Sequence, residues 1–357
     1  MVKRKRSVSF EDLASDVLIY MFGYLETKEL LQNIECLSKY CQNLLKLKMF
    51  WSETRIEFVD NLHPRFFEKY GFYIQNLCLK FVLIKAKPTE NYFKPLVNLK
   101  HLNLYRATFV DLSYIEDYID NAHQLEELIL PKTSSVSGKV FSNHFFLKVS
   151  KLKLRLLHLC YNQYFFESDY AMFLGYLTTN KLKLYLEDVQ FSNFPNLDTT
   201  FLCNFASSCK KLKLVNLDLC NLSSNSFNMF LDKIENLETL SAKFVEYNNK
   251  TMEILIKKEN LETITMCHVN HSNWEYNYLP QMKKLKKITI ISGATFNFDC
   301  LRNIKTLKTV SIFRTKINNM KGLYDYMIDN KNINFEVSRF SFPLLLENKI
   351  PSNVYLL

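Results

Sequence analysis

The chain repeats a six-residue pattern of hydrophobic and polar positions. The pattern reads most clearly at Leu214-Val215-Asn216-Leu217-Asp218-Leu219, where leucine fills the first, fourth and sixth positions. If Ile, Val, Met, Phe or Ala may replace some leucines, it recurs along most of the chain. Its leading positions are residues 74, 99, 125, 154, 181, 214, 237, 261, 285, 307 and 332, and the copies at 181 and 332 are weaker because Lys181 and Asn332 fill the leading place. The sequence therefore predicts eleven units, spaced by 22 to 33 residues.

Each copy of the pattern predicts a short strand. Alternate side chains of an extended segment point to the same side, so Leu217 and Leu219 are expected in the core, with Asn216, Asp218 and Cys220 facing outward. One unit cannot bury its leucines alone, so neighbouring units must stack.

Apolar stripes with helical spacing follow several of the predicted strands and indicate helices packed behind them. The clearest stripes are Tyr114, Ile115, Tyr118 and Ile119, then Phe227, Phe230, Leu231 and Ile234, and finally Leu323, Tyr326 and Met327.

A repeat of this length and phrase resembles leucine-rich-repeat proteins. The resemblance implies an α/β fold, a leucine-rich-repeat solenoid in which parallel strands line the concave face of a horseshoe. The family phrase continues L-x-x-L-x-L-x-x-N/C, and only Asn162 fills the last place as expected. The sequence therefore predicts irregular repeats without a continuous ladder of asparagine side chains.

The N-terminal part has a different, helical period. Val17, Leu18, Met21, Phe22 and Leu25 fall on one face of a helix. A second apolar stripe begins at Leu30, and the pattern continues to Phe50 and Trp51. Two or three short helices in so few residues bury too little surface to be stable alone. We expect the first repeats, a partner or both to complete this module.

The same stretch resembles the F-box. The segment from Leu13 to Leu25 is similar to the family's opening L-P-x-E-[VIL]-L-x-x-[IM]-F-x-[YF]-L, and Lys28-Glu29-Leu30-Leu31 resembles its [KR]-[DE]-L-L. Phe50-Trp51 resembles the closing motif. Ala14 stands where the family has proline, and Cys36-Leu37 invert its valine-cysteine order.

An F-box-like module followed by leucine-rich repeats is the layout of F-box/leucine-rich-repeat proteins. That resemblance implies a non-catalytic substrate receptor of a cullin-RING ubiquitin ligase, in which the F-box docks on a Skp-type adaptor and the repeats hold a protein substrate of unknown identity. The residues expected on the docking or packing face of the module are Leu13, Val17, Leu18, Phe22, Leu25, Leu30 and Leu31.

The outward positions of the strands are the expected substrate-binding surface, because a solenoid usually binds its partners there. In the first half they are aromatic, histidine, amide or charged, whereas in the second half most are Thr or Ser. The candidate substrate-binding residues are His101, Asn103, Tyr105, Glu127, His158, Lys183, Tyr185, Asn216 and Asp218.

These patterns divide the chain into five parts. They are a basic tail at 1–9, the F-box-like module at 10–52, a junction at 53–73, the leucine-rich repeats at 74–340 and a C-terminal capping tail at 341–357.

Charge and cysteine content narrow the partners and the compartment. The net charge of +10 admits an acidic partner or nucleic acid, but the lysines are dispersed over repeat edges and arginines are few, which disfavours nucleic acid. Nine cysteines without a C-x-x-C motif indicate a reducing compartment. No apolar run approaches the roughly 18 residues of a membrane helix, so we expect a cytoplasmic or nuclear protein that does not enter membranes. The basic stretch Lys3–Arg6 leaves nuclear import open.

The sequence offers little site chemistry. Cys267-His268-x-x-His271 is the one stretch with metal-like spacing, yet Cys267 and His268 should point to opposite sides of a strand. We therefore predict no metal, no cofactor and no catalytic residue. Two alternatives stay open: an interaction scaffold in which the helical module only caps the repeats, and a basic nucleic-acid-binding solenoid.

Overall fold

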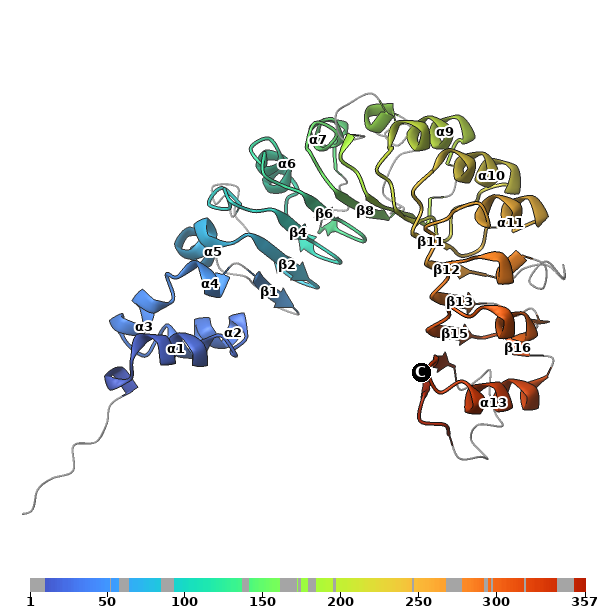
Figure 1. Cartoon of the computed structure of the whole chain (residues 1–357). Helices are drawn as coiled ribbons and strands as arrows, with labels where there is room; N and C mark the ends of the chain where they lie inside the picture. The colour runs from blue at the N-terminus through green and yellow to red at the C-terminus, as the bar shows by residue number, and fades with distance from the viewer. Residues whose placement is uncertain are drawn as a thin grey trace, which may run out of the picture. The chain divides into compact units, whose positions relative to one another are not determined.

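The structure is a computed structural model, and it falls into two compact units, Met1–Leu152 and Lys153–Leu357. Each unit contains a row of parallel strands with helices on one side (Figure 1). The predicted fold class, an α/β leucine-rich-repeat solenoid, is confirmed. The residues that the structure describes are 10–51, 53–57, 64–84, 93–136, 141–160, 172, 175–178, 184–194, 197–245, 247–267, 278–291, 295–296, 298–317, 319–338 and 350–357.

The first unit begins with a module of short helices. Helix α1 starts after Ala14 and ends before Gly23, and it buries Leu18 and Phe22, which lie one turn apart. The ring of Phe22 lies 6.1 Å from that of Phe50, measured between centroids. The elements of the module are a 3₁₀ turn at Phe10–Asp12, α1 at Ser15–Phe22, α2 at Thr27–Glu29, a π-helical turn at Leu30–Ile34, α3 at Lys39–Leu44 and α4 at Lys48–Trp51.

Trp51 joins this module to the first repeat. Its side chain is fully buried, its ring stacks on Tyr70 with 4.2 Å between centroids, and its indole N–H donates to the carbonyl of Leu45. Strand β1, Glu53–Glu57, follows at once and pairs in parallel with β2, Thr54 lying opposite Leu77. Trp51 therefore stands where a repeat has its leading leucine, and the strand ladder begins within the range predicted as a junction.

The strands of the first unit keep the predicted register. Leu77, Leu102 and Leu128 are direct partners on neighbouring strands and are almost fully buried. A fully buried leucine contributes roughly 1.5–3 kcal/mol relative to an exposed one. The elements are β1 at Glu53–Glu57, α5 at Pro64–Tyr70, a 3₁₀ turn at Gly71–Tyr73, β2 at Asn76–Lys80, β4 at His101–Asn103, α6 at Ser113–Ile119, β6 at Glu127–Ile129 and α7 at Asn143–Val149, with a small sheet of β3 at Leu83–Ile84, β5 at Thr108–Phe109 and β7 at Ser134–Ser135.

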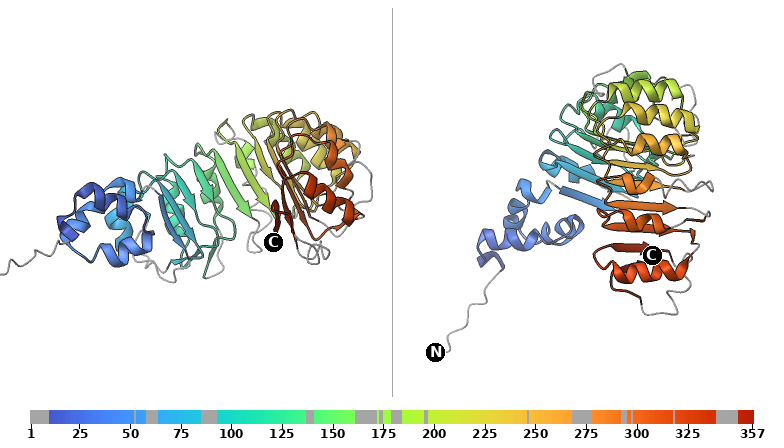
Figure 2. Two further views of the ribbon diagram at one scale, coloured as in Figure 1. Left: turned by 60° about the horizontal axis from the view of Figure 1, so that its bottom comes forward. Right: turned by 45° about the vertical axis from the view of Figure 1, so that its right-hand side comes forward.

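The second unit continues the same alternation of strand and return segment. Helices α9, α10, α11 and α13 lie on one side of its strands (Figures 1 and 2). Its strands are β8 at Leu156–Cys160, β9 at Asp188–Ser192, β10 at Leu214–Asn216, β11 at Thr239–Ala242, β12 at Thr263–Met266, β13 at Lys287–Ile291, β15 at Thr309–Phe313, β17 at Asn334–Val337 and β18 at Val354–Leu356. The other elements are α9 at Thr199–Ser208, α10 at Ser224–Lys233, α11 at Asn249–Leu255, α13 at Met320–Asp329, 3₁₀ turns at Leu279–Gln281 and Phe298–Asn303, and a small pair of β14 at Thr295–Phe296 and β16 at Lys316–Ile317.

The helical stripes predicted behind the strands are buried as expected. Tyr114, Ile115, Tyr118 and Ile119 form the buried side of α6. In the second unit the buried side chains of α10 include Phe227, Phe230 and Leu231, and those of α13 are Leu323, Tyr326 and Met327.

Two leading positions were wrong. Val215 pairs with Val189 and with Leu240, so the repeats begin at Leu186 and Leu212 and not at residues 181 and 214. Counting the leading residue as position one, positions four and six are then buried in both repeats. Leu184, predicted inward, is 55% exposed, and Leu219, also predicted inward, is 50% exposed. Leu217 is fully buried, as predicted.

Position eight of the phrase has a left-handed backbone, which ends the strand and turns the chain toward the return segment. Its φ angles lie between 51° and 63°. Only one of these residues is asparagine, although Gly and Asn adopt this conformation most easily. The residues are Phe81, Arg106, Lys132, Asn193, Leu219, Phe244 and Arg314.

The last described residues extend the sheet. Val354 of β18 lies opposite Phe335 of β17. The side-chain amide nitrogen of Asn353 lies 3.1 Å from the carbonyl oxygens of Met327 and Asn330 and 2.9 Å from that of Ile333. These carbonyls lie in and just after the last turn of α13, where backbone acceptors lack helical partners. Most of the predicted capping tail, residues 341–349, lies outside the described residues.

Candidate partner-binding site

The face of each sheet that points away from the helices is the candidate site, and we call it the outer face. It carries positions three, five and seven of each phrase, while positions four and six are buried. Most of its side chains at positions three and five are half-buried, because the strands on either side flank them. The outer face is therefore a fixed row of polar groups whose side chains have limited freedom.

On the first unit, His101 and Glu127 form a pair across β4 and β6. They are direct register partners, and Nδ1 of His101 lies 2.7 Å from Oε2 of Glu127. The two predicted residues are thus brought together, and each limits the contacts the other can offer to a partner.

Asn103 and Tyr105 lie at the end of the same strand. Oδ1 of Asn103 accepts from the backbone N–H of Tyr105 at 3.0 Å, so this side chain closes the end of its own strand. The guanidinium of Arg106 lies 5.5 Å from the centre of the Tyr105 ring and 5.3 Å from that of Phe81. Cation–π contact of this kind holds a flexible arginine over a rigid ring.

On the second unit, His158 pairs with Asp188. The two residues lie on the neighbouring strands β8 and β9, and Nε2 of His158 is 3.0 Å from Oδ1 of Asp188. The next outward residue on β9, Gln190, donates from its amide to the hydroxyl of Ser192 at 2.7 Å. Polar contacts therefore run along the strand as well as across it.

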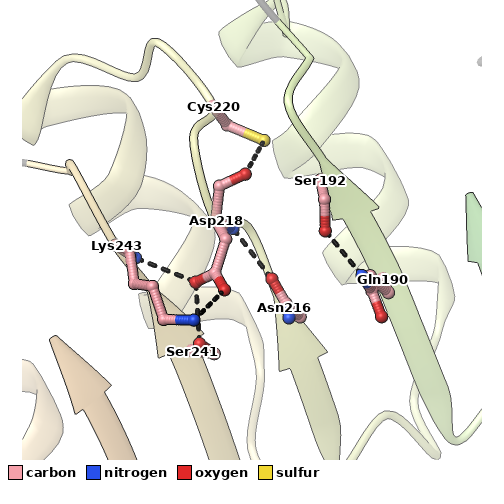
Figure 3. Close-up of polar contacts among 7 residues, drawn as sticks. All are labelled: Gln190, Ser192, Asn216, Asp218, Cys220, Ser241 and Lys243. Atoms are coloured by element: carbon pink, nitrogen blue, oxygen red, sulfur yellow. Dashed lines mark hydrogen bonds and ion pairs between the residues drawn. The ribbon is translucent and has the colours of Figure 1, made fainter. Parts of the chain in front are cut away.

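Asp218 is the hub of the polar cluster in Figure 3. Its Oδ1 accepts from the hydroxyl of Ser241 at 2.7 Å and from the backbone N–H of Lys243 at 3.0 Å. Its Oδ2 lies 2.9 Å from the Lys243 ammonium. Its backbone N–H donates to Oδ1 of Asn216 at 2.8 Å, and its carbonyl accepts from Asn193 N–H at 2.7 Å.

Asp218 was predicted to face outward as a substrate-binding residue, but only 8% of its surface is exposed. Both carboxylate oxygens of Asp218 already contact groups of the neighbouring repeat. The carboxylate therefore holds Lys243 and β11 in place. Asn216 does lie on the outer face, and it repeats the arrangement of Asn103: an amide oxygen that closes the end of its own strand.

Tyr185 and Lys183 were predicted on the strand because of the wrong leading position. Tyr185 precedes Leu186 and lies at the N-terminal edge of the sheet, with the ammonium groups of Lys153 and Lys211 at 5.9 and 5.8 Å from its ring centre. Lys183 lies outside the described residues. The true outward residues of this repeat, Asp188, Gln190 and Ser192, were missed.

The side chain at position nine of the phrase makes a buried hydrogen bond to the preceding repeat, and in one repeat the predicted residue at this position was wrong. In the corrected register Cys220, predicted to face outward, fills it and is 1% exposed. Its thiol donates to the carbonyl of Phe191 at 2.7 Å, and Thr133 makes the same contact with the carbonyl of Leu104 at 2.8 Å. Burial raises the pKa of the Cys220 thiol to about 12. Cysteine and threonine thus supply part of the ladder that asparagine supplies in regular repeats.

The N-terminal module has a second candidate surface. Leu18, Phe22 and Leu30, predicted on its docking or packing face, are buried in the module, whereas Val17 is 43% exposed. The remaining three predicted residues, Leu13, Leu25 and Leu31, are partly exposed.

Three apolar residues on the exposed side of this module were not among the predicted ones. Tyr20, Met21 and Tyr24 are 67%, 44% and 73% exposed, and the Tyr24 hydroxyl donates to that of Tyr20 at 2.6 Å. Their spacing from Val17 places Tyr20 and Met21 on one side of α1 and Tyr24 in the turn that follows it, and this i, i+3, i+4, i+7 pattern was readable in the sequence.

The metal-like stretch gains no support. Cys267 is buried, and His268 and His271 lie outside the described residues. Among the residues that the structure describes, no three His, Cys, Asp or Glu side chains gather in a group that could hold a metal ion. Within the same residues, no helix combines the length and the apolar character required to cross a bilayer.

Comparison with known proteins identifies the fold. No family model and no curated protein matches the sequence. The structure is similar to a chain in the crystal structure of the Rad7 and Elc1 complex in yeast, with a TM-score of 0.61 and 13% identity over 96% of this chain and 90% of that one. An internalin of Listeria monocytogenes matches with a TM-score of 0.40 and 13% identity over 81% and 77% of the two chains. A chain of the TLR13–ssRNA13 complex matches with a TM-score of 0.39 and 14% identity over 82% and 46%. At 13% identity, the likeness to the chain from the Rad7 and Elc1 complex extends to the leucine-rich-repeat fold and no further.

Proposed function

We propose that this chain is a substrate-recognition subunit of a Skp-cullin-F-box type ubiquitin ligase. In this role the helical module docks on a Skp-type adaptor, and the outer face of the repeats binds a protein target. The chain itself performs no chemistry. It raises the effective concentration of the target near the catalytic end of the ligase.

The observation that carries the proposal is that α1 is apolar on two sides. Leu18 and Phe22 on its inner side already provide the burial that a capping helix needs. Val17, Tyr20, Met21 and Tyr24 then form a second apolar surface, which we call the α1 outer patch. A contiguous exposed apolar surface usually marks an interaction site.

Two further features support a protein-binding role. The solved chain with the same fold was crystallised in a complex with a second protein. On the outer face, pairs such as His101–Glu127 and His158–Asp188 hold polar groups in place before any partner arrives. Groups ordered in advance lose less conformational entropy on binding.

A pull-down of the full chain on a purified Skp-type adaptor tests the adaptor part of the proposal. We expect the wild-type chain to be retained and the double variant V17E/M21E to be lost, because two carboxylates would have to be buried in the interface. The matched control is V110E/M229E. Val110 is 43% and Met229 is 45% exposed, compared with 43% for Val17 and 44% for Met21.

Surface substitutions are preferable to deleting the module. Deletion of residues 10–51 would remove Trp51, which packs on Tyr70 of the first repeat, and would expose that core. If the wild-type chain is not retained on the adaptor, the interaction scaffold without a ligase link replaces the proposal. Retention of V17E/M21E together with the wild type would exclude the α1 outer patch as the docking surface.

A further inference from the structure

Position two of each phrase forms a row of charged residues along the N-terminal edge of the sheets. Neighbouring repeats usually carry opposite charges there. The Lys100 ammonium lies 3.5 Å from a carboxylate oxygen of Glu126, that of Lys213 lies 3.5 Å from Glu238, and that of Lys286 lies 2.6 Å from Glu262. In these three pairs the side chains at position two neutralise one another across neighbouring repeats, whereas Glu238 and Glu262 are neighbours of like charge whose partners lie on their other sides.

This pairing stops at Lys308. Its neighbour on one side is Lys286, and the two backbones are joined by a hydrogen bond from Lys308 N–H to Lys286 carbonyl at 2.7 Å. Lys286 already has Glu262 as its partner, and the next repeat has the buried apolar residue Ile333 at position two. Lys308 is exposed and has no acidic partner among the described residues. Like charges at neighbouring positions of a sheet are destabilising.

A second pair of neighbouring lysines lies three residues earlier in the same two repeats. Lys283 lies two residues before the leading residue Leu285, and Lys305 lies two residues before the leading residue Leu307. Both lysines are exposed. Neither has an ion-pair partner among the described residues. Lys283, Lys286, Lys305 and Lys308 thus form a two-by-two group at the start of β13 and β15, which we call the basic edge.

We propose that the basic edge binds an acidic segment of a partner protein. The proposal rests on the role of the repeats as the partner-binding part of the chain and names the chemical class of that partner. Carboxylates of an extended acidic segment would supply the negative charges that the neighbouring repeats supply elsewhere in the row. Electrostatic complementarity of this kind sets the specificity and speed of association.

The composition of the edge favours an acidic protein over nucleic acid. Residues 283–287, 305–309 and 330–334 are all described, and they contain neither arginine nor an aromatic residue. Single-stranded nucleic acid is usually held by base stacking on aromatic rings, and arginine provides bidentate contacts to phosphate. Lysine ammonium groups instead act as separate point charges, which suit carboxylates spaced along a peptide.

Fluorescence anisotropy with a labelled polyglutamate peptide at low ionic strength tests the proposal on the full chain. We expect binding that weakens with added salt and falls about tenfold in K305E/K308E. The control K250E/K321E changes the net charge equally at exposed lysines of α11 and α13 and should alter the affinity by less than about twofold. The single variant K308E should raise Tm, since it relieves the contact with Lys286.

Three outcomes would overturn the proposal. They are the absence of polyglutamate binding to the wild type at low salt, equal losses in K305E/K308E and the control, and tighter binding of a labelled oligouridylate than of polyglutamate. The last result would assign the basic edge to nucleic acid. The adaptor pull-down is independent of these readings, so a failure of the ligase proposal can be told apart from a failure here.

Discussion

Leu217 and Leu219 are two residues apart, yet they lie in opposite environments. Simple alternation would bury both, but the left-handed backbone of Leu219, with φ of 61°, breaks the alternation. The chain turns there, so that Cys220 enters the core and Leu219 remains 50% exposed. A left-handed leucine costs of order 1 kcal/mol, and burial of the side chains on either side of the turn offsets it.

Truncation of the two leucines tests this geometry. Leu217→Ala should lower the free energy of unfolding by about 2–5 kcal/mol, because it leaves a cavity in a packed core. Leu219→Ala should lower it by less than about 0.5 kcal/mol, as is usual for surface positions. Urea denaturation of both variants measures the difference, and equal losses would mean that the corrected register is wrong.

Cys220 provides a second test at a single side chain. With its pKa raised to about 12, the thiol stays protonated and buried, so iodoacetamide at about pH 8 should leave Cys220 unmodified in the native chain while it alkylates the exposed Cys36. Peptide mapping by mass spectrometry reads both sites.

The raised pKa of the Cys220 thiol also makes the free energy of unfolding depend on pH. The thiol's contribution is complete below its unfolded-state pKa of about 8.5 and is lost as the pH rises through its folded-state pKa of about 12. Rapid alkylation of Cys220 in the native chain would contradict its burial and its hydrogen bond to Phe191.

At the scale of elements, buried polar contacts join the helices α10 and α11. Oδ1 of Asn248 accepts from the backbone N–H of Thr251 at 2.9 Å, and the Thr251 hydroxyl donates to Oδ1 of Asn228 at 2.7 Å. The Asn228 amide donates back to Oδ1 of Asn248 at 3.3 Å, which closes the network. Thr251 and Asn228 are almost fully buried. Asn248 therefore caps its own helix and satisfies a buried amide of the preceding one.

Asn248→Ala should cost about 1–3 kcal/mol, since it removes a helix cap and leaves buried donors unpaired. Asn249→Ala is the matched control, because Asn249 is the exposed next residue in the same helix. Thermal unfolding of both variants gives the comparison. A loss in the control as large as that in Asn248→Ala would show that α11 tolerates neither change, and that the network has no special weight.

Most strands were predictable from the sequence. The predicted register was wrong where leucine lies at positions that the repeat phrase does not assign to it. Leu214 lies outward and Leu219 lies at the left-handed turn, so Leu214-Leu217-Leu219 imitates the repeat phrase better than the true Leu212-Val215-Leu217. Both registers place Asn216 outward and Leu217 inward, and they differ at Leu214 and Val215 before it and at Asp218, Leu219 and Cys220 after it. The placement of Asp218 depended on hydrogen bonds from the next repeat, which no local pattern reveals.

The sequence pattern likewise did not separate the buried side of α1 from its exposed side. Val17, Leu18, Met21 and Phe22 share a broad apolar stripe, and helical spacing alone does not say which part is buried. Packing against Phe10 and Phe50 selects Phe22 for the interior. The α1 outer patch became visible only once that choice was known.

For the molecule as a whole, the structure contains separate surfaces suited to separate partners. The α1 outer patch belongs to the first unit, and the basic edge belongs to the second. One is apolar and the other is lined with lysine, so their affinities should respond differently to salt: binding at the basic edge should weaken as ionic strength rises, whereas binding through the patch should change little. Two separate surfaces of this kind would allow the proposed receptor to hold an adaptor and a target at the same time.

Isothermal titration calorimetry of the full chain with a purified Skp-type adaptor measures whether the helical module docks through the α1 outer patch. We expect saturable binding by the wild type and by V110E/M229E, with loss of measurable binding in V17E/M21E. Absence of binding by the wild type, or unchanged affinity in V17E/M21E, would contradict this proposal.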